Sequence, residues 1–549
     1  MVPDQAMDER ASAGPADGRQ PGAAAPRMTL NEELRPATSE RVLRSLALRT
    51  RTAGSDAFAV APAQTDNGDE ARYGDKSGTY TKGVLQSGIG LVDPVAYATF
   101  KAALASGSPA DFEKIILGGP RTLNGPQAGL AFHLDSLDGS QYAAPAAPAL
   151  ASEAYATELI ELYWASLLRD VAFGSYEQSS VAQRAAAELS SLPEYAGPRD
   201  NHTGQVTPRL LLRGDFAGEK LGPYLSQFLL LPATLGALPI TQQYATNRAG
   251  LDYMTEPGEF LDVQNGRPTG KSLLTAGARY LNDGRALAAF THGDVLFQAY
   301  FLAYLVLDTI NSRLPPPLNS GNPYAASRTQ NGFGTFGQPD ITSTLAAVAG
   351  EAIREVWYQK WWAHLRHRPE SGGAIVHLQQ TGQGGAVEGH LSHTVLNSQA
   401  VQASFSANNS YFLSQAFPEG SPTHPAYPAG HGTVGGACIT VLKFFFDGNF
   451  PITNPVVPSA DATKLEKYYP PPGERPLTVN SELHKLAHNI SFGHGIHAGI
   501  HWRSDTDESI KLGEAIALSY LRDHAHAYNE HFSVSITKLD GSVATISNP

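Results

Sequence analysis

Three short segments late in the chain concentrate side chains that could hold an oxyanion and move a proton. Only three of the 18 histidines precede His364. The first segment carries Lys360 and, eight residues later, Arg368, which stands directly before a proline. A point charge and a planar guanidinium together suit an oxyanion. Because a residue before proline leaves the helical region, we expect Arg368 to turn back toward the helix end. Basic residues at a helix C-terminus are also favoured by its dipole, so a purely structural role is the alternative.

The second segment, residues 421–433, ends in Ala-Gly-His before a run of apolar residues. If Pro428 takes the first helical position, the backbone N–H groups of Ala429, Gly430 and His431 would face an anion at the helix N-terminus. His431 would then act as acid or base beside that anion. The structural alternative is a helix cap that carries a surface histidine.

The third segment places His494, His497 and His501 at three- and four-residue spacing, followed by Asp505. If the segment is helical, Asp505 lies one turn beyond His501 and fixes the tautomer of its ring. The three histidines would share one face, which could hold a divalent metal. No fourth protein ligand is evident, and Gly495 weakens the helix, so we predict no metal site.

Long helical patterns predict a mainly α fold of helical bundles with long loops. The alternation around an Asp-Gly turn at residues 533–547 predicts a small C-terminal β-hairpin. We expect residues 1–40 to form a flexible arm and residues 41–549 a single domain whose active-site half spans about 341–526. Apolar residues at three- and four-residue spacing predict helices at 153–171, 292–314, 341–364, 434–446, 480–492 and 507–526. Gly-, Pro- and Asn-rich connections that we expect to be lids or site walls lie at 315–338, 369–399 and 447–476.

Composition excludes several classes of function. The formal charge is −12 and no basic tract is present, which argues against nucleic acid or an anionic membrane as a partner. No apolar run reaches the roughly 20 residues that a membrane span needs. The single cysteine, Cys438, excludes an internal disulfide and a Cys-rich zinc site. With no export signal at the start, we expect a cytoplasmic protein.

Together these segments resemble the vanadium-dependent haloperoxidases, which share a site plan with a class of acid phosphatases. The family pattern of Lys…Arg-Pro, then Pro-Ser-Gly-His, then Arg…His…Asp is similar to residues 360–370, 421–431 and 501–505. A further stretch, residues 213–228, is similar to the bromoperoxidase-like branch. The resemblance implies helical bundles, a homodimer, and an oxyanion held between the bundles.

The resemblance also implies roles for individual residues. Lys360, Arg368 and Gly430 align with vanadate-binding positions, His501 with the histidine bonded to vanadium, and His431 with the acid–base. Two positions depart from the pattern. The vanadate-binding serine is Ala429, and the second arginine is Gly495, with His494 beside it. A hydrogen bond to a charged group contributes about 1.5–3 kcal/mol, so losing both side chains should weaken vanadate binding by about 3–6 kcal/mol.

We therefore favour a site that has lost vanadate and needs no cofactor. It resembles the homologues of napyradiomycin and merochlorin pathways that move a substituent by an α-hydroxyketone (acyloin) rearrangement on a naphthoquinone meroterpenoid. His431 or His494 would be the base, and Lys360 and Arg368 would hold the developing alkoxide. Residues expected to contact the substrate or its oxyanion are Gly430, His501, Ala429, Gly495, His424 and Asp505.

Three alternatives stay open. The first is an intact chloro- or bromoperoxidase that uses vanadate on His501, hydrogen peroxide and halide. The second is a phosphatase with His501 as nucleophile, oriented by Asp505. The third is a non-catalytic binding protein, which the retention of Lys360, Arg368 and His431 argues against, because unpaired cations near a core are costly.

Overall fold

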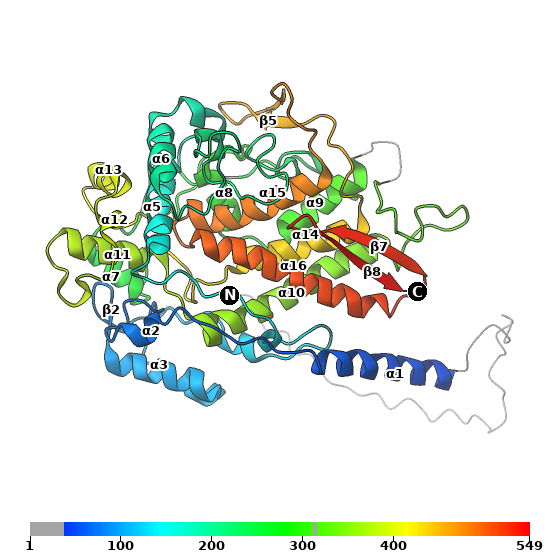
Figure 1. The fold of residues 1–549 in the computed structure, drawn as a ribbon, viewed down its shortest axis with the longest axis horizontal. Coiled ribbons are helices and arrows are strands. Elements are labelled where there is room, and N and C mark those ends of the chain that lie inside the picture. The colour runs from blue at the N-terminus through cyan, green and yellow to red at the C-terminus, as the bar shows by residue number, and fades with distance from the viewer. Residues whose placement is uncertain (1–37, 311–315, 549) are drawn as a thin grey trace, which may run out of the picture. The chain divides into compact units, whose positions relative to one another are not determined.

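The computed structural model describes residues 38–310 and 316–548 (Figure 1). The chain divides into two units, residues 1–51 and 52–549. The predicted arm at residues 1–40 lies almost wholly outside the described residues, which begin with the helix α1 (Thr38–Ala57). No described helix combines the length and apolar character that crossing a membrane requires.

The second unit is mainly helical, as predicted, and the sheets among its described residues are all two-stranded. Its helices, in chain order, are α2 (Asp69–Arg72), α3 (Pro94–Ser106), α4 (Pro109–Phe112), α5 (Glu153–Leu168), α6 (Ser180–Ser191), α7 (Pro257–Gln264), α8 (Gly284–Thr291), α9 (Gln298–Thr309), α10 (Gln338–Tyr358), α11 (Pro369–Gln380), α12 (His393–Leu396), α13 (Gln399–Asn408), α14 (Gly430–Phe445), α15 (Val479–Phe492) and α16 (Arg503–Ala525). The strands pair as antiparallel hairpins, β1 (Gln86–Gly88) with β2 (Leu91–Val92), β3 (Ala233–Leu235) with β4 (Leu238–Ile240), β5 (Val456–Pro458) with β6 (Leu465–Lys467), and β7 (Phe532–Thr537) with β8 (Val543–Asn548).

All six predicted helices and the C-terminal hairpin are confirmed, with shifts at their ends. The predicted helix at 292–314 begins later, at Gln298, and the last four residues of that prediction lie outside the described residues. In the hairpin, Val534, Ile536 and Ile546 are buried, as the alternating pattern requires.

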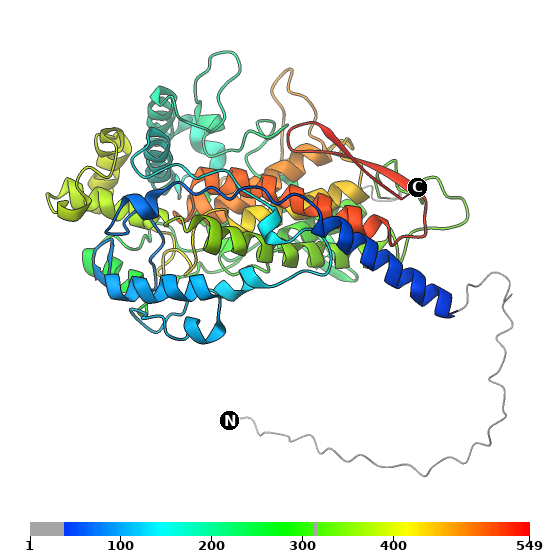
Figure 2. The ribbon, with the colours of Figure 1, turned by 60° about the horizontal axis from the view of Figure 1, so that its bottom comes forward.

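The core is built around α14, in which every residue is buried. Figures 1 and 2 show α10, α14, α15 and α16 side by side at the centre of this unit. The backbones of α14 and α16 touch where glycines face the partner helix. A Cβ on Gly436 would lie 1.9 Å from the carbonyl oxygen of Ile510, and one on Gly513 would lie 2.0 Å from that of Thr433. These close approaches fix the first half of α14 against the first half of α16.

Two helices of this core end in π-helical turns. α10 continues as the π-helical turn Gln359–His364, and α15 continues as Gly493–His497. The prediction of one helix over 341–364 is therefore corrected at its last turn. π-Helical turns rotate side chains out of the regular helical register and are frequent at functional sites. Here they carry Lys360 and His494.

One predicted loop is partly wrong. Residues 369–399 contain α11 and α12, not a continuous lid or wall. Gly372 and Gly373 suggest a loop in the sequence, but both are buried in α11. A Cβ on Gly372 would lie 2.4 Å from the Tyr155 hydroxyl, and one on Gly373 would lie 2.6 Å from the Leu413 nitrogen. These glycines serve close packing of α11 against its neighbours.

Candidate active site

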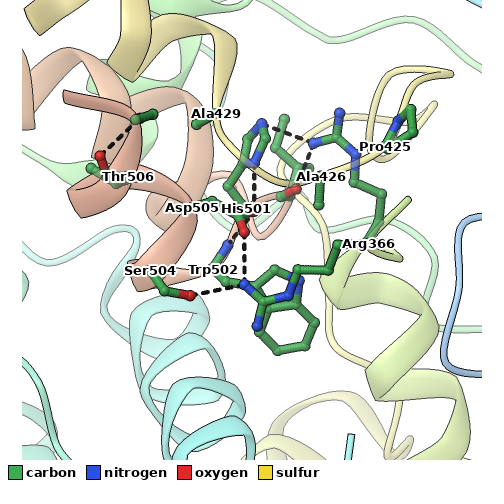
Figure 3. A network of polar contacts seen from close by, with 12 residues as sticks. Arg366, Pro425, Ala426, Ala429, His501, Trp502, Ser504, Asp505 and Thr506 are labelled. Atoms are coloured by element: carbon green, nitrogen blue, oxygen red, sulfur yellow. Dashed lines mark hydrogen bonds and ion pairs between the residues drawn. The ribbon is translucent and has the colours of Figure 1, made fainter. Parts of the chain in front are cut away.

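The candidate active site lies where α14 and α16 begin and where the two π-helical turns end α10 and α15. Figure 3 shows His501, Asp505 and Arg366 joined in one line of polar contacts, next to the backbone at Ala429. The Ala429 N–H donates to the carbonyl of Asp505 at 3.0 Å. This bond ties the first residues of α14 to the first turn of α16.

Lys360 and Arg368 converge on the loop that precedes α14. Both are buried. Lys360 Nζ donates to the carbonyls of Pro425 at 2.9 Å and Ala426 at 2.7 Å. Arg368 Nε donates to the carbonyl of His424 at 2.9 Å. Burial, followed by the charge of Arg368, holds the pKa of Lys360 well below its usual value. Lys360 and Arg368 thus both hold the loop that leads into α14.

The backbone at Arg368 is extended, with φ −84 and ψ 155, as expected before a proline. This turns its guanidinium toward the α16 side of the site. Nη1 donates to the carbonyl of Ile500 at 2.8 Å and to Nε2 of His501 at 2.9 Å. Nη2 lies 3.0 Å from Nδ1 of His424, whose ring packs 4.6 Å from that of Trp357. Burial lowers the pKa of Arg368 to about 10, so the guanidinium stays charged at neutral pH.

The N-terminus of α14 presents open backbone donors one residue later than predicted. Ala429 is the N-cap residue and Gly430 the first helical residue, so Pro428 lies outside the helix. The Ala429 N–H is satisfied by Asp505. Among the described residues, nothing accepts from the N–H groups of Gly430, His431 or Gly432. Three donors at the positive end of a 16-residue helix form a cradle for a developing oxyanion.

His431 is held by an aspartate that the sequence interpretation missed. Its Nε2 lies 2.9 Å from Oδ1 of Asp294, whose side chain is only 3% exposed. An ionised carboxylate can only accept, so this contact selects, for the neutral ring, the tautomer with the hydrogen on Nε2 and the lone pair on Nδ1. No described residue hydrogen-bonds Nδ1. The pair has the geometry of a carboxylate-oriented imidazole base.

His494 stands between the other two site histidines. Its ring stacks on that of His431 at 3.8 Å and lies 6.0 Å from that of His501. Its Nδ1 lies 3.2 Å from the carbonyl of Thr291. Burial, followed by the neighbouring His431, holds the pKa of His494 well below its usual value. It is therefore neutral at physiological pH.

His501 is fixed on both nitrogens. Nδ1 donates to Oδ2 of Asp505 at 2.8 Å, and Nε2 accepts from Arg368. His501 precedes α16, and Asp505 lies in its first turn, so the predicted contact exists although His501 itself is not helical. Asp505 also accepts from Arg366 Nη1 at 2.7 Å, and Arg366 Nη2 donates to Glu158 at 2.8 Å. The resulting line of charges positions the His501 ring.

The two sequence departures remove side-chain donors from this site. Ala429 is buried at the α14 N-cap, where it makes no side-chain cap bond. At Gly495, a Cβ would lie 2.8 Å from the Cβ of His501. That distance is closer than real Cβ contacts, so any larger residue at 495 would have to displace His501. The site is therefore packed around a glycine at this position.

The third histidine of the predicted cluster points elsewhere. His497 Nε2 lies 2.9 Å from the Tyr224 hydroxyl, and its ring meets Phe173 edge-on at 5.5 Å. It does not join His494 and His501, so the metal alternative fails on geometry. No group of three or more His, Cys, Asp or Glu within residues 38–310 and 316–548 is arranged to hold a metal ion.

The structure thus brings the ten residues predicted for the catalytic and oxyanion-binding site to one region of the fold. They are Lys360, Arg368, His424, Ala429, Gly430, His431, His494, Gly495, His501 and Asp505. Three further residues were missed: Asp294, Arg366 and Glu158. A sequence signal exists for Asp294, because His292-Gly-Asp294 is a polar interruption between two apolar helices.

Chemically, the site offers an oriented imidazole base, buried cations and a cradle of backbone donors. Such an arrangement can remove a proton from one oxygen of a substrate while it stabilises negative charge on another.

Comparisons with known proteins agree with this architecture. Residues 341–530 match the family model described as the VCPO second helical-bundle domain. The chain is 30% identical to the vanadium-dependent bromoperoxidase of Corallina officinalis over 87% of this chain and 94% of that one. It is 31% identical to the vanadium-dependent bromoperoxidase of Ascophyllum nodosum over 87% of each chain. The homohexameric structure of the second vanadate-dependent bromoperoxidase from Ascophyllum nodosum superposes with a TM-score of 0.89 at 26% identity, over 99% of this chain and 96% of that one. This chain belongs to the vanadium-dependent haloperoxidase family.

Proposed function

We propose that this chain catalyses an α-hydroxyketone (acyloin) rearrangement, a 1,2-shift on a naphthoquinone meroterpenoid, without a cofactor. One observation carries the proposal. The base, His431, and the cradle of open N–H groups at the start of α14 are both present. By contrast, positions 429 and 495, where the family pattern has a vanadate-binding serine and arginine, carry alanine and glycine. The cytoplasmic homodimer expected from the sequence is part of the same proposal.

The reaction is an isomerisation, so atoms and electrons balance without an oxidant. Nδ1 of His431 takes the proton of the substrate hydroxyl. The alkoxide electrons form a new C=O bond as the substituent moves, with its bonding pair, to the adjacent carbonyl carbon. The π electrons of the old carbonyl become an alkoxide, to which His431 returns the proton. Asp294 keeps the His431 ring in the required tautomer and stabilises its protonated form.

The oxygen of the old carbonyl becomes the alkoxide, so it is the substrate oxygen that positive charge must stabilise. The open N–H groups of Gly430 and Gly432 lie at the start of α14, and the Lys360 amine and the charged Arg368 guanidinium lie against the loop that precedes it. Donors aimed at a developing oxyanion commonly contribute about 10²–10³ in rate each. An oriented general base contributes about 10²–10⁴.

Vanadate, the group implied by the family, fits the residues present poorly. It would have to be held by Lys360, Arg368, the α14 amides and His501, with no hydroxyl at 429 and no guanidinium at 495. Moreover, Nε2 of His501 accepts a hydrogen bond from Arg368. We therefore derive no step through vanadate.

The test is conversion of an α-hydroxyketone naphthoquinone by vanadium-free protein, followed by chromatography and NMR of the isomeric product. We expect the rate with His431→Ala to fall by about 10²–10⁴. The exposed histidine control, His393→Ala, should keep the wild-type rate. No isomer above the uncatalysed rate, or an isomer formed equally well by His431→Ala, would overturn the proposal.

A second candidate, a vanadium-dependent chloro- or bromoperoxidase, is favoured by a specific observation. Lys360, Arg368 and His501 are all retained at the site, and the relatives named above are bromoperoxidases. This function requires retained vanadate and turnover of peroxide and halide. Vanadium retention and bromide turnover, measured in one sample, separate the two functions.

A further inference from the structure

A cavity of about 440 Å³ lies apart from the candidate active site. Two segments that the proposed function leaves unused contribute to it: the 213–228 stretch and the long connection at 447–476. The cavity lies within the size range of small-molecule sites. None of Lys360, Arg368, His431, His494 or His501 is among its lining residues.

The π-helical turn Gly493–His497 separates the two places. His494 stacks on His431 on the active-site side. His497, three residues later, bonds the Tyr224 hydroxyl, and Tyr224 is part of the cavity wall. The cavity is therefore a distinct site that shares one supporting turn with the active site.

Aromatic side chains dominate the cavity wall. Phe173 and Tyr224 stack face to face at 3.8 Å, and Tyr176, Tyr468 and Tyr469 complete the aromatic lining. Tyr469 is 75% exposed at the rim, whereas Tyr176 is 2% exposed. Flat rings with this range of depths suit a planar aromatic ligand, which gains both apolar burial and ring contacts.

The charge of the lining is positive. Arg213 is buried and donates to the carbonyls of Arg209, Glu219 and Gly222, all of them neutral acceptors. No carboxylate lies within ion-pair distance of Arg213 among the described residues. Its guanidinium packs over the Tyr224 ring at 5.5 Å. A buried cation without a counter-ion is unfavourable alone and favours an anionic ligand.

Arg209 adds a second cation with donors to spare. Its Nη2 pairs with Glu474, and no described residue accepts from its Nε or Nη1. The one carboxylate of the lining, Glu177, is exposed. Arginine donors match a carboxylate or phenolate oxygen well.

We propose that this cavity binds a small planar aromatic anion, such as an aromatic carboxylate, independently of the proposed catalytic function. The rings of the wall contact the planar face of the ligand. Arg209 donates to its anionic oxygen, and Arg213 supplies the compensating charge behind it.

The test measures binding of the fluorescent probe 2-naphthoate to the full chain, with 2-naphthamide as a neutral probe of the same shape. We expect 2-naphthoate to bind with one site per chain and 2-naphthamide at least about tenfold more weakly. Arg209→Gln should weaken 2-naphthoate binding at least fivefold and leave 2-naphthamide binding unchanged. Loss of discrimination between the probes is a readout that a general loss of fold would not give.

A blocking variant locates the probe. Gly174 lines the cavity, and a Cβ there meets nothing within 4 Å, so a larger side chain can begin at this position. Gly258 is equally open but lies in α7, outside the lining, so Gly258→Trp is the matched control. We expect Gly174→Trp to weaken 2-naphthoate binding at least tenfold and Gly258→Trp to leave it unchanged.

Absent binding, equal binding of both probes, or binding insensitive to Gly174→Trp would overturn the proposal. His431→Ala should bind 2-naphthoate normally, so failure here is distinguishable from failure of the proposed function.

Discussion

A single hydrogen bond, from His431 Nε2 to Asp294, decides which imidazole nitrogen can take a proton. It leaves Nδ1 as the acceptor, next to the open amides of α14. The neighbouring His494 has a strongly lowered pKa, so it is a much weaker base at neutral pH. At the scale of single residues, the geometry thus favours His431 over His494 as the base, a choice that the sequence left open.

Asp294→Asn tests this assignment. An amide can donate to Nε2 and so stabilise the tautomer with its hydrogen on Nδ1, which cannot act as the base. We expect the rate of the rearrangement to fall by about 10²–10⁴ with an unchanged KM. Steady-state kinetics of isomer formation measure this fall in rate. Asp262→Asn is the control, because Asp262 is an exposed carboxylate. A full wild-type rate in Asp294→Asn would show that His431 needs no orienting partner.

Arg366 positions the site through Asp505, and its loss should show in stability. It forms buried ion pairs with both Glu158 and Asp505. Arg366→Met leaves two buried carboxylates without this partner, which should lower the free energy of unfolding by about 3–5 kcal/mol. Arg267→Ala breaks an exposed pair with Asp262 and should cost less than about 1 kcal/mol. Denaturant unfolding compares the two; equal losses would contradict a buried network.

Residue identity and spacing in the sequence were enough to predict Lys360, Arg368, His431, His501 and Asp505 as one site. Asp294 could not be placed, because 137 residues separate it from His431 and only the packed fold brings them together. Arg366 was overlooked although it lies two residues before Arg368. Its role depends on Glu158 in α5, which no local pattern connects to it.

Among the elements, the π-helical turns do most to shape the site. Periodicity predicts the helices α10 and α15 but not the widened turns that end them. For the same reason the sequence suggested that His494, His497 and His501 share a face, whereas the Gly493–His497 turn sends His497 to the opposite side. The glycines of α11 contributed to the wrong prediction of a loop at 369–399, because glycine is favoured both in loops and where helices pack closely.

Gly495→Ala probes the turn directly. A methyl group 2.8 Å from the Cβ of His501 must displace that residue, so we expect a loss of about 1–3 kcal/mol in stability and a fall in activity. Gly350→Ala in α10 is the control, because its Cβ meets only the end of the Arg354 side chain at 3.8 Å. That control should be neutral or slightly stabilising. Thermal unfolding of both variants measures this difference. A Gly495→Ala unfolding temperature equal to that of the wild type would refute tight packing at residue 495.

At the scale of the whole molecule, ionisation inside the core links stability to pH. His488 is buried between Glu219 at 2.5 Å and Asp507 at 2.8 Å. Burial alone would lower the pKa of His488, but these two carboxylates raise it to about 9. Because the unfolded value is about 6.5, the stabilisation is complete below about pH 6.5 and is lost as the pH rises through 9.

His488→Gln should therefore lower the unfolding temperature most near pH 6 and progressively less toward pH 10. The stabilisation at low pH corresponds to about 3 kcal/mol. His393→Gln, an exposed substitution, should show no pH-dependent difference from wild type. A His488→Gln deficit that stays constant from pH 6 to 10 would contradict a raised pKa.

We propose that the oxyanion site of this haloperoxidase fold binds a substrate ketone in place of vanadate. The most direct measurement is the amount of vanadium retained per chain after incubation with orthovanadate and desalting, with peroxide and bromide turnover followed in the same sample. We predict far less than one vanadium per chain and no bromide-dependent turnover. About one vanadium per chain with sustained bromide oxidation would contradict the account and establish the peroxidase.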